Sequence, residues 1–523
     1  MDALFVPLAS AIGSSVDQIK LISCLLIACP LGSLFIRIPA SQPNLKHLFN
    51  LLVSVFFFIP VLNLSWGFGQ LLGSVLGTYY IAANVKGPNM PWIVFTFVMG
   101  HLTVNHIIRA FYNLSYETFE VTGPQMVLTM KLTTFAWNVW DGRTAPENLD
   151  KWQLQKRITN YPTLLEFLGY SFYFPGVLVG PYLDYASYMS LIDESLFEGK
   201  RSPTSTRSIP DGRKRVAYRK MLTGLVFLGI FVVLSPSFYY GIVITPWFMT
   251  QGFIYRMAYF QFSGFIERSK YYAIWTLTEV RFMSCRRRNA NIGDQGASIL
   301  TGLGFTGYGP SGESTWEGAA NVKVLEIELP SNFKVLLDSW NINTNIWLRE
   351  CIYKRVTPKG KKPGFSSSML TFATSAFWHG IATGYYLTFF FGGFITTAGR
   401  LCRANLRPLI LPPPGAPTTT IKLIYDWTGT FVSILILNYV AAPFMLLTFT
   451  DSIEAWRRLH WYGFWMIGST LAFFWLGGSK FLKALQKKEG KVADKVVTPE
   501  SHVMPPPLDD VAEELKELQK RMK

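Results

Sequence analysis

The sequence predicts an all-α polytopic membrane protein with about eleven transmembrane or re-entrant helices. Half of the 523 residues are hydrophobic and only 16% are charged, unlike a soluble domain. The chain also has 16 Trp, 24 Tyr and 41 Phe, an excess typical of aromatic rings at membrane interfaces. The apolar runs are continuous, whereas a β-barrel would show alternating segments of about ten residues. Helices of roughly 20 residues therefore cross the bilayer.

Nine apolar stretches are expected to cross or enter the membrane. They are residues 19–38, 45–62, 66–83, 91–108, 222–244, 252–266, 367–398, 423–449 and 461–476. Two further apolar regions, residues 121–140 and 164–185, are interrupted by polar residues, and the second also contains prolines and glycines. Such breaks are tolerated in a membrane only against protein or a water-filled cavity. We therefore expect these two segments to lie inside the helix bundle.

The formal net charge of +16 is concentrated in short clusters, which are residues 199–220, 286–288, 354–364 and 480–491. Basic clusters between spans are typical of cytoplasmic loops and attract anionic headgroups. An alternative is that some of these cations bind an anionic cosubstrate. Nucleic acid binding is not expected of short basic loops between so many spans. Nothing in the sequence specifies an oligomeric state.

The membrane topology requires one additional crossing. If the basic loops before residue 222 and around residues 354–362 are cytoplasmic, three simple crossings after residue 366 place the basic C-terminus outside. The stretch 366–398 is longer than one span needs. A re-entrant or doubled segment there restores the topology and places His379 near its bend.

Most cysteines and histidines carry no predicted site. The five cysteines are scattered without a CxxC pair, so we expect buried thiols and no metal site; they are Cys24, Cys29, Cys285, Cys351 and Cys402. Five histidines lie near expected span ends or in the tail, where a solvated or interfacial position is expected; they are His47, His101, His106, His460 and His502.

His379 differs because it lies inside an apolar run, TSAFWHGIATGYYLTFF, residues 374–390. An ionisable side chain in a membrane segment is costly and indicates a functional site. Its ordinary pKa, near 6.5, allows an imidazole to exchange a proton at neutral pH. The alternative is a structural histidine bonded to a neighbouring helix. Ala376, Gly380 and Gly384 support that alternative, since small residues at this spacing are typical of close helix packing.

A second polar group lies upstream, in DSWNINTNIWLRECIYKRV, residues 338–356. On a helix, Asn341, Asn345 and Arg349 follow one another at steps of four and share a face. This face predicts either hydrogen bonds between helices or the polar wall of a reaction chamber that His379 also lines.

Several short motifs, taken in order, resemble the membrane-bound O-acyltransferase family, and in particular its lysophospholipid acyltransferase branch. Trp340-Asn341 is followed 38 residues later by Trp378-His379-Gly380. Three more blocks agree, WNVWDGR at 137–143, FPGVLVGPYLDYASY at 174–188 and WEGAANVKV at 316–324. The resemblance covers residues 137–386. The N-terminal spans and the tail agree with the family in hydropathy only. We expect N-terminal transmembrane helices in residues 1–110, a catalytic core in 111–480 and a basic cytosolic tail in 481–523. The tail carries apolar residues at steps of three and four, typical of a short amphipathic helix; they are Leu508, Val511, Leu515, Leu518 and Met522.

The resemblance also implies helices around an intramembrane chamber, with His379 as the catalytic base and Asn341 as its partner. Acyl-CoA is then the cosubstrate and a lysophospholipid the acceptor, without a cofactor or metal. The residues expected to bind substrate are Trp340, Asn345, Trp378, Asp141 and Glu317. The basic residues just past the Asn341 segment are expected to contact the CoA phosphates; they are Arg349, Lys354, Arg355 and Lys359.

Two other functions remain open from the sequence. One is a transporter or channel that binds a polar solute through His379 and the amides, and the other is a family enzyme with a non-phospholipid acceptor. The block LLDSWNINTN departs from the FYxDWWN pattern of the branch that acylates sterols and diacylglycerol, which argues against those acceptors. The C-terminal KRMK is similar to a dilysine-type retrieval signal, with Arg521 in place of a lysine. It implies residence in the endoplasmic reticulum membrane.

Overall fold

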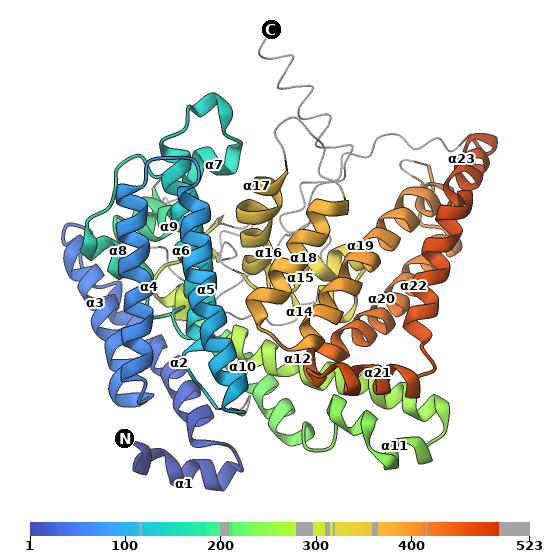
Figure 1. The fold of residues 1–523 in the computed structure, drawn as a ribbon, viewed down its shortest axis with the longest axis horizontal. Helices are drawn as coiled ribbons and strands as arrows, with labels where there is room; N and C mark the ends of the chain where they lie inside the picture. The colour runs from blue at the N-terminus through green and yellow to red at the C-terminus, as the bar shows by residue number, and fades with distance from the viewer. Residues whose placement is uncertain are drawn as a thin grey trace. The chain divides into compact units, whose positions relative to one another are not determined.

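The computed structural model describes residues 1–114, 118–180, 182–198, 210, 212–278, 297–308, 314–316, 320–357, 365–413 and 416–490. They are largely helical (Figure 1). The one sheet among them is an antiparallel pair of short strands, β1 (Gly307–Tyr308) and β2 (Ser314–Thr315). The chain forms two compact units, unit 1 (Met1–Gly229 and Tyr271–Val322) and unit 2 (Ile230–Lys270 and Lys323–Lys523).

Unit 1 is built mainly from the N-terminal helices, and η denotes short 3₁₀ or π segments. Its elements are α1 (Asp2–Ile12), α2 (Val16–Phe35), α3 (Pro43–Phe56), η1 (Phe57–Val61), α4 (Ser65–Asn84), α5 (Met90–Phe111), α6 (Thr122–Gly142), η2 (Pro146–Asn148), α7 (Lys151–Lys156), α8 (Leu164–Ser171), α9 (Tyr185–Ile192), η3 (Ser195–Phe197), α13 (Ala297–Leu300) and the first part of α10 (Arg213–Leu234). Local sequence fixes several starts. Ser15 and Gln18 form a reciprocal capping box at α2, which satisfies backbone donors left free at a helix start.

Unit 2 contains the helices around the two predicted site blocks. Its elements are η4 (Tyr240–Ile244), α11 (Pro246–Thr250), most of α12 (Phe253–Thr278), α14 (Val324–Glu328), α15 (Phe333–Ser339), α16 (Ile342–Leu348), η5 (Arg349–Tyr353), α17 (Lys354–Val356), α18 (Phe365–His379), α19 (Thr383–Ile410), α20 (Thr420–Leu446), α21 (Phe449–Arg458), α22 (Tyr462–Phe473), η6 (Phe474–Gly478) and α23 (Ser479–Lys488). The guanidinium of Arg268 on α12 makes two hydrogen bonds of 2.8 Å to Glu328 on α14 and a third to Asn438 on α20. These bonds tie the segment before the WN block to α20.

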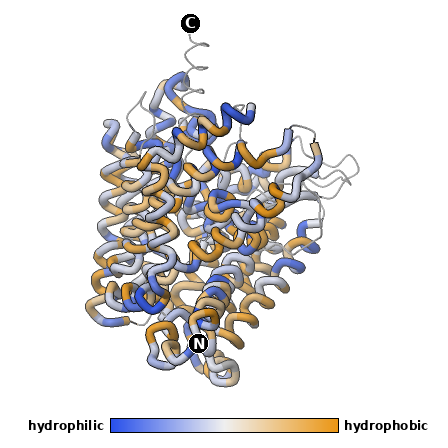
Figure 2. Tube along the Cα trace, turned by 90° about the vertical axis from the view of Figure 1, so that its right-hand side faces the viewer, coloured by the Kyte–Doolittle hydropathy of each residue, from blue (hydrophilic) through white to orange (hydrophobic). Residues whose placement is uncertain are grey.

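The nine stretches expected to cross or enter the membrane fall mainly on helices, with non-helical breaks at residues 235–239 and 380–382. Among the described residues, five helical segments are long and apolar enough to cross a bilayer, namely α2, α3 with η1, α5, α10 and α20. Figure 2 shows hydrophobic and weakly polar residues along most of the helices, with strongly hydrophilic residues in short stretches. The class of all-α membrane protein is thereby confirmed. The number of about eleven segments stays a prediction.

The broken region after α8 is enclosed by protein, as its sequence predicts. The helix ends at Ser171, which leaves backbone carbonyls without helical partners. The ammonium group of the buried Lys131 on α6 donates to the carbonyls of Tyr170 and Ser171, the latter at 3.0 Å. Ser54 Oγ on α3 donates to the Phe172 carbonyl at 2.7 Å. Two neighbouring helices thus supply the hydrogen bonds that a break in a membrane segment requires.

The expectation that His47 is solvated or interfacial is wrong. Its side chain is fully buried, and Nδ1 lies 2.8 Å from the Tyr188 hydroxyl on α9. Asn50 donates to the same hydroxyl at 3.1 Å, and the buried Lys46 makes a 3.0 Å ion pair with Glu194. The polar face of α3 therefore packs into unit 1. The partners are far away in the chain, so the local sequence could not indicate them.

Candidate active site

His379 is the last residue of α18, and a short non-helical segment separates it from α19. Gly380 has φ of 132°, and its N–H donates to the carbonyls of Ala376 and Phe377, each at 3.2 Å. Glycine adopts this backbone conformation readily because it has no Cβ. The stretch 366–398 is divided between two separate helices, α18 and α19, which pack against each other. The additional membrane crossing stays a prediction. Gly380 follows the last residue of α18, so the predicted stripe of Ala376, Gly380 and Gly384 does not continue along a single helix.

Gly384 does have the packing role predicted for it. Its N–H donates to the Leu447 carbonyl at 2.7 Å. A Cβ at this position would lie 2.0 Å from the Pro443 carbonyl oxygen, so only glycine allows the start of α19 to approach the end of α20 this closely. The contact fixes the position of Phe444, the residue after Pro443.

Aromatic rings surround the His379 imidazole. Its centroid lies 4.6 Å from that of Trp378, 4.9 Å from Phe444, 5.3 Å from Phe389 and 5.7 Å from Tyr385. Phe389 stacks on the imidazole at an interplanar angle of 20°, whereas Phe444 meets it edge to face at 84°. These contacts hold the ring in one orientation in largely apolar surroundings.

Asn341 sits in a strained turn at the start of α16. Its φ of 46° is left-handed, a conformation that asparagine tolerates better than most residues. Its Oδ1 accepts from Thr344 Oγ1 at 2.9 Å. The Asn345 amide donates to the carbonyls of Leu337 and Trp340, at 3.2 and 2.7 Å. The continuous helical face predicted for Asn341, Asn345 and Arg349 is thus wrong at its first member, because α16 begins after Asn341.

The WN block and the WHG block are brought together by two tryptophans. Trp347 on α16 and Trp378 on α18 have ring centroids 5.7 Å apart, and α18 also packs on η5. Asn341 is the residue immediately before α16 and precedes Trp347 by six residues. The elements that carry His379 and Asn341 are therefore neighbours, although 38 residues separate the two in sequence.

The sequence analysis did not single out Glu350, which forms ion pairs with two of the residues predicted to contact CoA. Its carboxylate is almost fully buried and pairs with Arg349 at 2.7 Å and with Lys354 at 2.8 Å. Arg355 donates from Nε to the Glu350 backbone carbonyl at 3.1 Å. The structure thus gathers three of the four predicted cations around one buried acid. Lys359 lies outside the described residues.

Asp338 is a second carboxyl that the sequence did not single out. It lies on α15, outside the five candidate spans, and its Oδ1 is buried without a hydrogen bond from the described residues. Burial raises the pKa of Asp338 to about 6, against the opposing effect of Lys334 and Arg349. Asp338 therefore changes its charge close to neutral pH, three residues from Asn341.

The predicted residues of the WDGR block lie in unit 1. Asp141 is fully buried near the end of α6, while Arg143 donates to the carbonyls of Ala82 and Val85, at 2.6 and 2.8 Å, and so caps α4. A Cβ on Gly142 would lie 1.8 Å from the Ile158 carbonyl oxygen, which explains the glycine. Glu317 lies outside the described residues.

Comparison with known proteins decides the family. A model of the membrane-bound O-acyltransferase family matches residues 108–442, a range that holds all the predicted site residues. The chain belongs to this family. The resemblance drawn from the ordered motifs is thereby confirmed, and with the apolar helices it makes the chain a multi-pass membrane protein.

Relatives of the family align with nearly the whole chain. A lysophospholipid acyltransferase of Schizosaccharomyces pombe is 36% identical over 460 residues, which cover 88% of this chain and 86% of the relative. A lysophospholipid acyltransferase of Saccharomyces cerevisiae is 35% identical over 511 residues, covering 94% and 80%. The membrane-bound glycerophospholipid O-acyltransferase 1 of Mus musculus is 29% identical over 469 residues, covering 87% and 89%.

Proposed function

We propose that this protein transfers a fatty acyl group from acyl-CoA to the free hydroxyl of a lysophospholipid. The observation that carries the proposal is His379, held among aromatic rings at a helix break next to the element that bears Asn341. The names of the relatives support this acceptor class. The ordered WN and WHG blocks distinguish the chain from a channel or transporter that merely contains a polar residue.

In the proposed reaction, His379 acts as a general base. The imidazole removes the proton from the lysophospholipid hydroxyl as its oxygen attacks the thioester carbonyl carbon of acyl-CoA. The new C–O bond forms, the C–S bond breaks, and the imidazolium returns its proton to the departing CoA thiolate. A positioned base of this kind typically contributes about 10²- to 10⁴-fold to the rate. No serine or cysteine nucleophile is needed, because both substrates are held within reach of each other.

Asn341 is proposed as the partner of His379, either orienting the acceptor or donating to the thioester oxygen as negative charge develops there. An amide donor suits the second role because a preorganised dipole stabilises that charge without a change of its own protonation. The fixed left-handed backbone of Asn341 and its bond to Thr344 limit the freedom of the side chain. Trp340 and Trp378, which flank the two residues, are proposed to contact substrate.

The CoA phosphates are proposed to bind the cations around Glu350. Arg349 and Lys354 pair with that carboxylate, so the incoming phosphates compete with one negative charge for two positive ones. Arg355 and Lys359 add further positive charge in the sequence. An excess of cations of this kind raises the local concentration of an anionic substrate.

The test is a coupled measurement of thiol release by purified protein. Acyl-CoA is supplied with lysophosphatidylcholine, -ethanolamine, -serine or lysophosphatidic acid, and wild-type protein should release CoA thiol with at least one of them. His379→Ala should lower the rate by about 10²-fold or more with an unchanged melting temperature. Absence of turnover with all four acceptors would contradict the proposal, and turnover with a sterol or diacylglycerol alone would reassign the acceptor.

We also propose that the protein resides in the endoplasmic reticulum. The C-terminal KRMK supports this location through its similarity to a dilysine-type signal. Replacing the two lysines of this motif by serine should shift a tagged protein to later compartments of the secretory route. An unchanged distribution would show that another signal retains it.

A further inference from the structure

A cavity of about 360 Å³ lies in unit 1 between the end of α2 and the start of α10. Its lining comes from both segments and consists of Pro30, Ser33, Leu34, Arg37, Lys214 and Tyr218. None of these residues belongs to the predicted catalytic or CoA-binding set. The cavity is therefore a separate feature that the proposed acyl transfer does not use.

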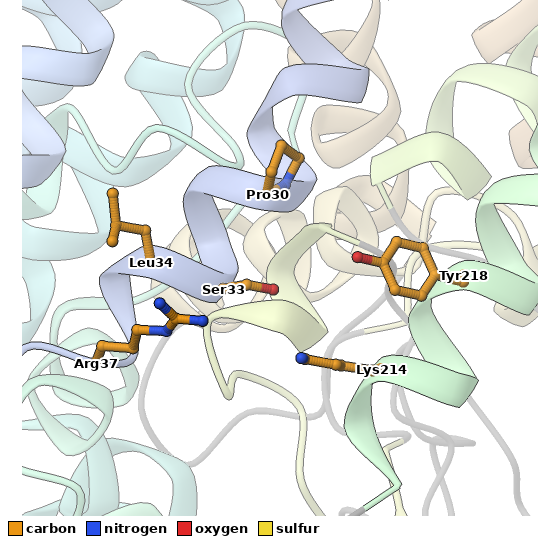
Figure 3. Close-up of a pocket in the computed structure, with 6 residues that line it drawn as sticks. All are labelled: Pro30, Ser33, Leu34, Arg37, Lys214 and Tyr218. Carbon is orange, nitrogen blue, oxygen red and sulfur yellow. The ribbon is translucent and has the colours of Figure 1, made fainter.

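Polar groups of four residues converge on this space. Figure 3 shows the Arg37 guanidinium, the Lys214 ammonium and the hydroxyls of Ser33 and Tyr218 directed toward one another across the gap between the helices. Ser33 Oγ is buried and lacks a hydrogen-bond partner among the described residues. The described lining contains two cations and two hydroxyl donors, and no carboxylate. Such a set is complementary to an anion that accepts several hydrogen bonds.

The charge of the lining favours a phosphate monoester. A phosphate monoester carries about 1.5 to 2 negative charges near pH 7 and offers three strong acceptor oxygens, which matches two cations and two hydroxyls. Guanidinium and ammonium groups both bind phosphate with charge-assisted hydrogen bonds. A choline or ethanolamine headgroup would instead bring a third cation next to Arg37 and Lys214, where the described lining offers no compensating acid.

The surfaces leading away from the cavity are apolar and exposed. On α10, Lys214, Tyr218, Leu222 and Val226 follow one another at steps of four and so share one face, with Leu222 and Val226 63% and 53% exposed. On α2, Ile27, Pro30 and Leu34 are spaced by three and four residues and are exposed as well.

Both helices are candidate membrane spans, and the two cations lie at the ends where the spans meet the interface. A cation and a hydroxyl therefore lie at the cavity on each side, Arg37 and Ser33 at the end of α2 and Lys214 and Tyr218 on α10, and an apolar row runs along each span. A ligand with the same pattern has an anionic head and hydrocarbon chains.

From this arrangement we infer that the cavity binds the phosphate monoester headgroup of a diacylglycerol phosphate, with its acyl chains along the exposed rows of α2 and α10. The apolar rows favour this lipid over free phosphate, because free phosphate has no hydrocarbon chain to contact them. The site is independent of the proposed acyl transfer, because none of its residues takes part in that reaction.

The test is photolabelling of the full-length protein in phosphatidylcholine vesicles. A diacylglycerol phosphate with a photoreactive group in one acyl chain should label peptides of α2 and α10 in the wild-type protein. The double variant Arg37→Gln, Lys214→Gln should show a loss of about tenfold or more, because two charge-assisted hydrogen-bonding groups are removed. The variant Arg37→Lys, Lys214→Arg, which keeps both charges, should retain most of the labelling.

A matched control removes the same charge outside the cavity. Arg215 is adjacent to Lys214 and exposed, and Lys151 is exposed on α7; neither lines the cavity. Arg215→Gln, Lys151→Gln should label like wild type. An equal loss of labelling in this control would show that the loss depends on the net charge of the protein, and it would overturn the inference.

Three further outcomes would also overturn the inference. They are wild-type labelling of the Arg37→Gln, Lys214→Gln protein, equal labelling by phosphatidylcholine or phosphatidylserine probes, and displacement of the lipid probe by inorganic phosphate at a similar concentration. Acyl transfer measured on the same vesicles reports the proposed function separately. A melting temperature close to that of wild type for the double variant shows that a loss of labelling does not come from unfolding.

Discussion

The substitution Gly384→Ala tests whether the helix contact next to His379 positions the catalytic ring. The new Cβ would lie 2.0 Å from the Pro443 carbonyl oxygen and 2.9 Å from the Leu447 Cα. Ordinary contacts begin near 3.4 Å, so α19 and α20 must separate by about 1.4 Å, the difference between the two distances. Overpacking of this kind typically costs about 1–3 kcal/mol, and loss of the 2.7 Å bond from the Gly384 N–H to the Leu447 carbonyl adds about 0.5–1.5 kcal/mol.

The separation also moves Phe444 away from His379 and Tyr385, with which its ring now lies at 4.9 and 4.7 Å. We therefore expect Gly384→Ala to lower both the melting temperature in detergent and the kcat of thiol release. Gly399→Ala, on the same helix, is the matched control, because its Cβ would meet only Phe333 at 3.8 Å and alanine favours a helix. Wild-type activity and stability in Gly384→Ala would refute the proposed positioning by close helix contact.

Three other substitutions test charged residues of the two units. The pKa of Asp338, raised to about 6 by burial, means that the folded protein holds its proton more tightly than the unfolded chain. This contribution to stability is complete below the unfolded pKa, near 3.8, and is lost as the pH rises through 6. Asp338→Asn should therefore raise the melting temperature at about pH 7.5 much more than at about pH 4, and an equal gain at both would contradict the cause given. Glu350→Gln should lower the KM for acyl-CoA at low ionic strength, because it frees Arg349 and Lys354 for the phosphates; a KM that stays the same in initial-rate measurements would place the phosphates elsewhere. Lys131→Met should lower the melting temperature, because each carbonyl left unsatisfied at the end of α8 costs about 1–3 kcal/mol, and unchanged melting would show that other donors replace it.

The sequence predicted the membrane helices well because their signal is local. A continuous apolar run of bilayer length has few alternatives to a helix, and residues 423–449 accordingly appear as α20 (Thr420–Leu446). The excess length of the stretch 366–398 predicts a re-entrant or doubled segment around His379. The stretch is divided there between α18 and α19, and α19 continues to Ile410.

The errors concern partners that are distant in the chain or details of the backbone. His47 is buried and forms a hydrogen bond with the Tyr188 hydroxyl, 141 residues away in the chain. No local sequence pattern indicates this partner. Glu350 stands between cations in the sequence, so its near-complete burial was not evident. Asn341 was assigned to a helical face, but its left-handed φ ends that face one residue before α16 begins. Periodicity predicts which residues share a face only where the backbone stays helical.

Small residues around His379 predict close helix packing, and this packing is compatible with a catalytic role for the imidazole. Gly380 ends α18 directly after His379, so the imidazole stands at a helix end instead of in the middle of a span. Gly384 then lets the end of α20 approach until Phe444 lies edge to face against the ring. A larger residue at either position would alter the backbone or the packing that fixes the base. The glycines that indicated a structural helix contact are thus the residues that give His379 its defined position, and their substitution should affect activity and stability together.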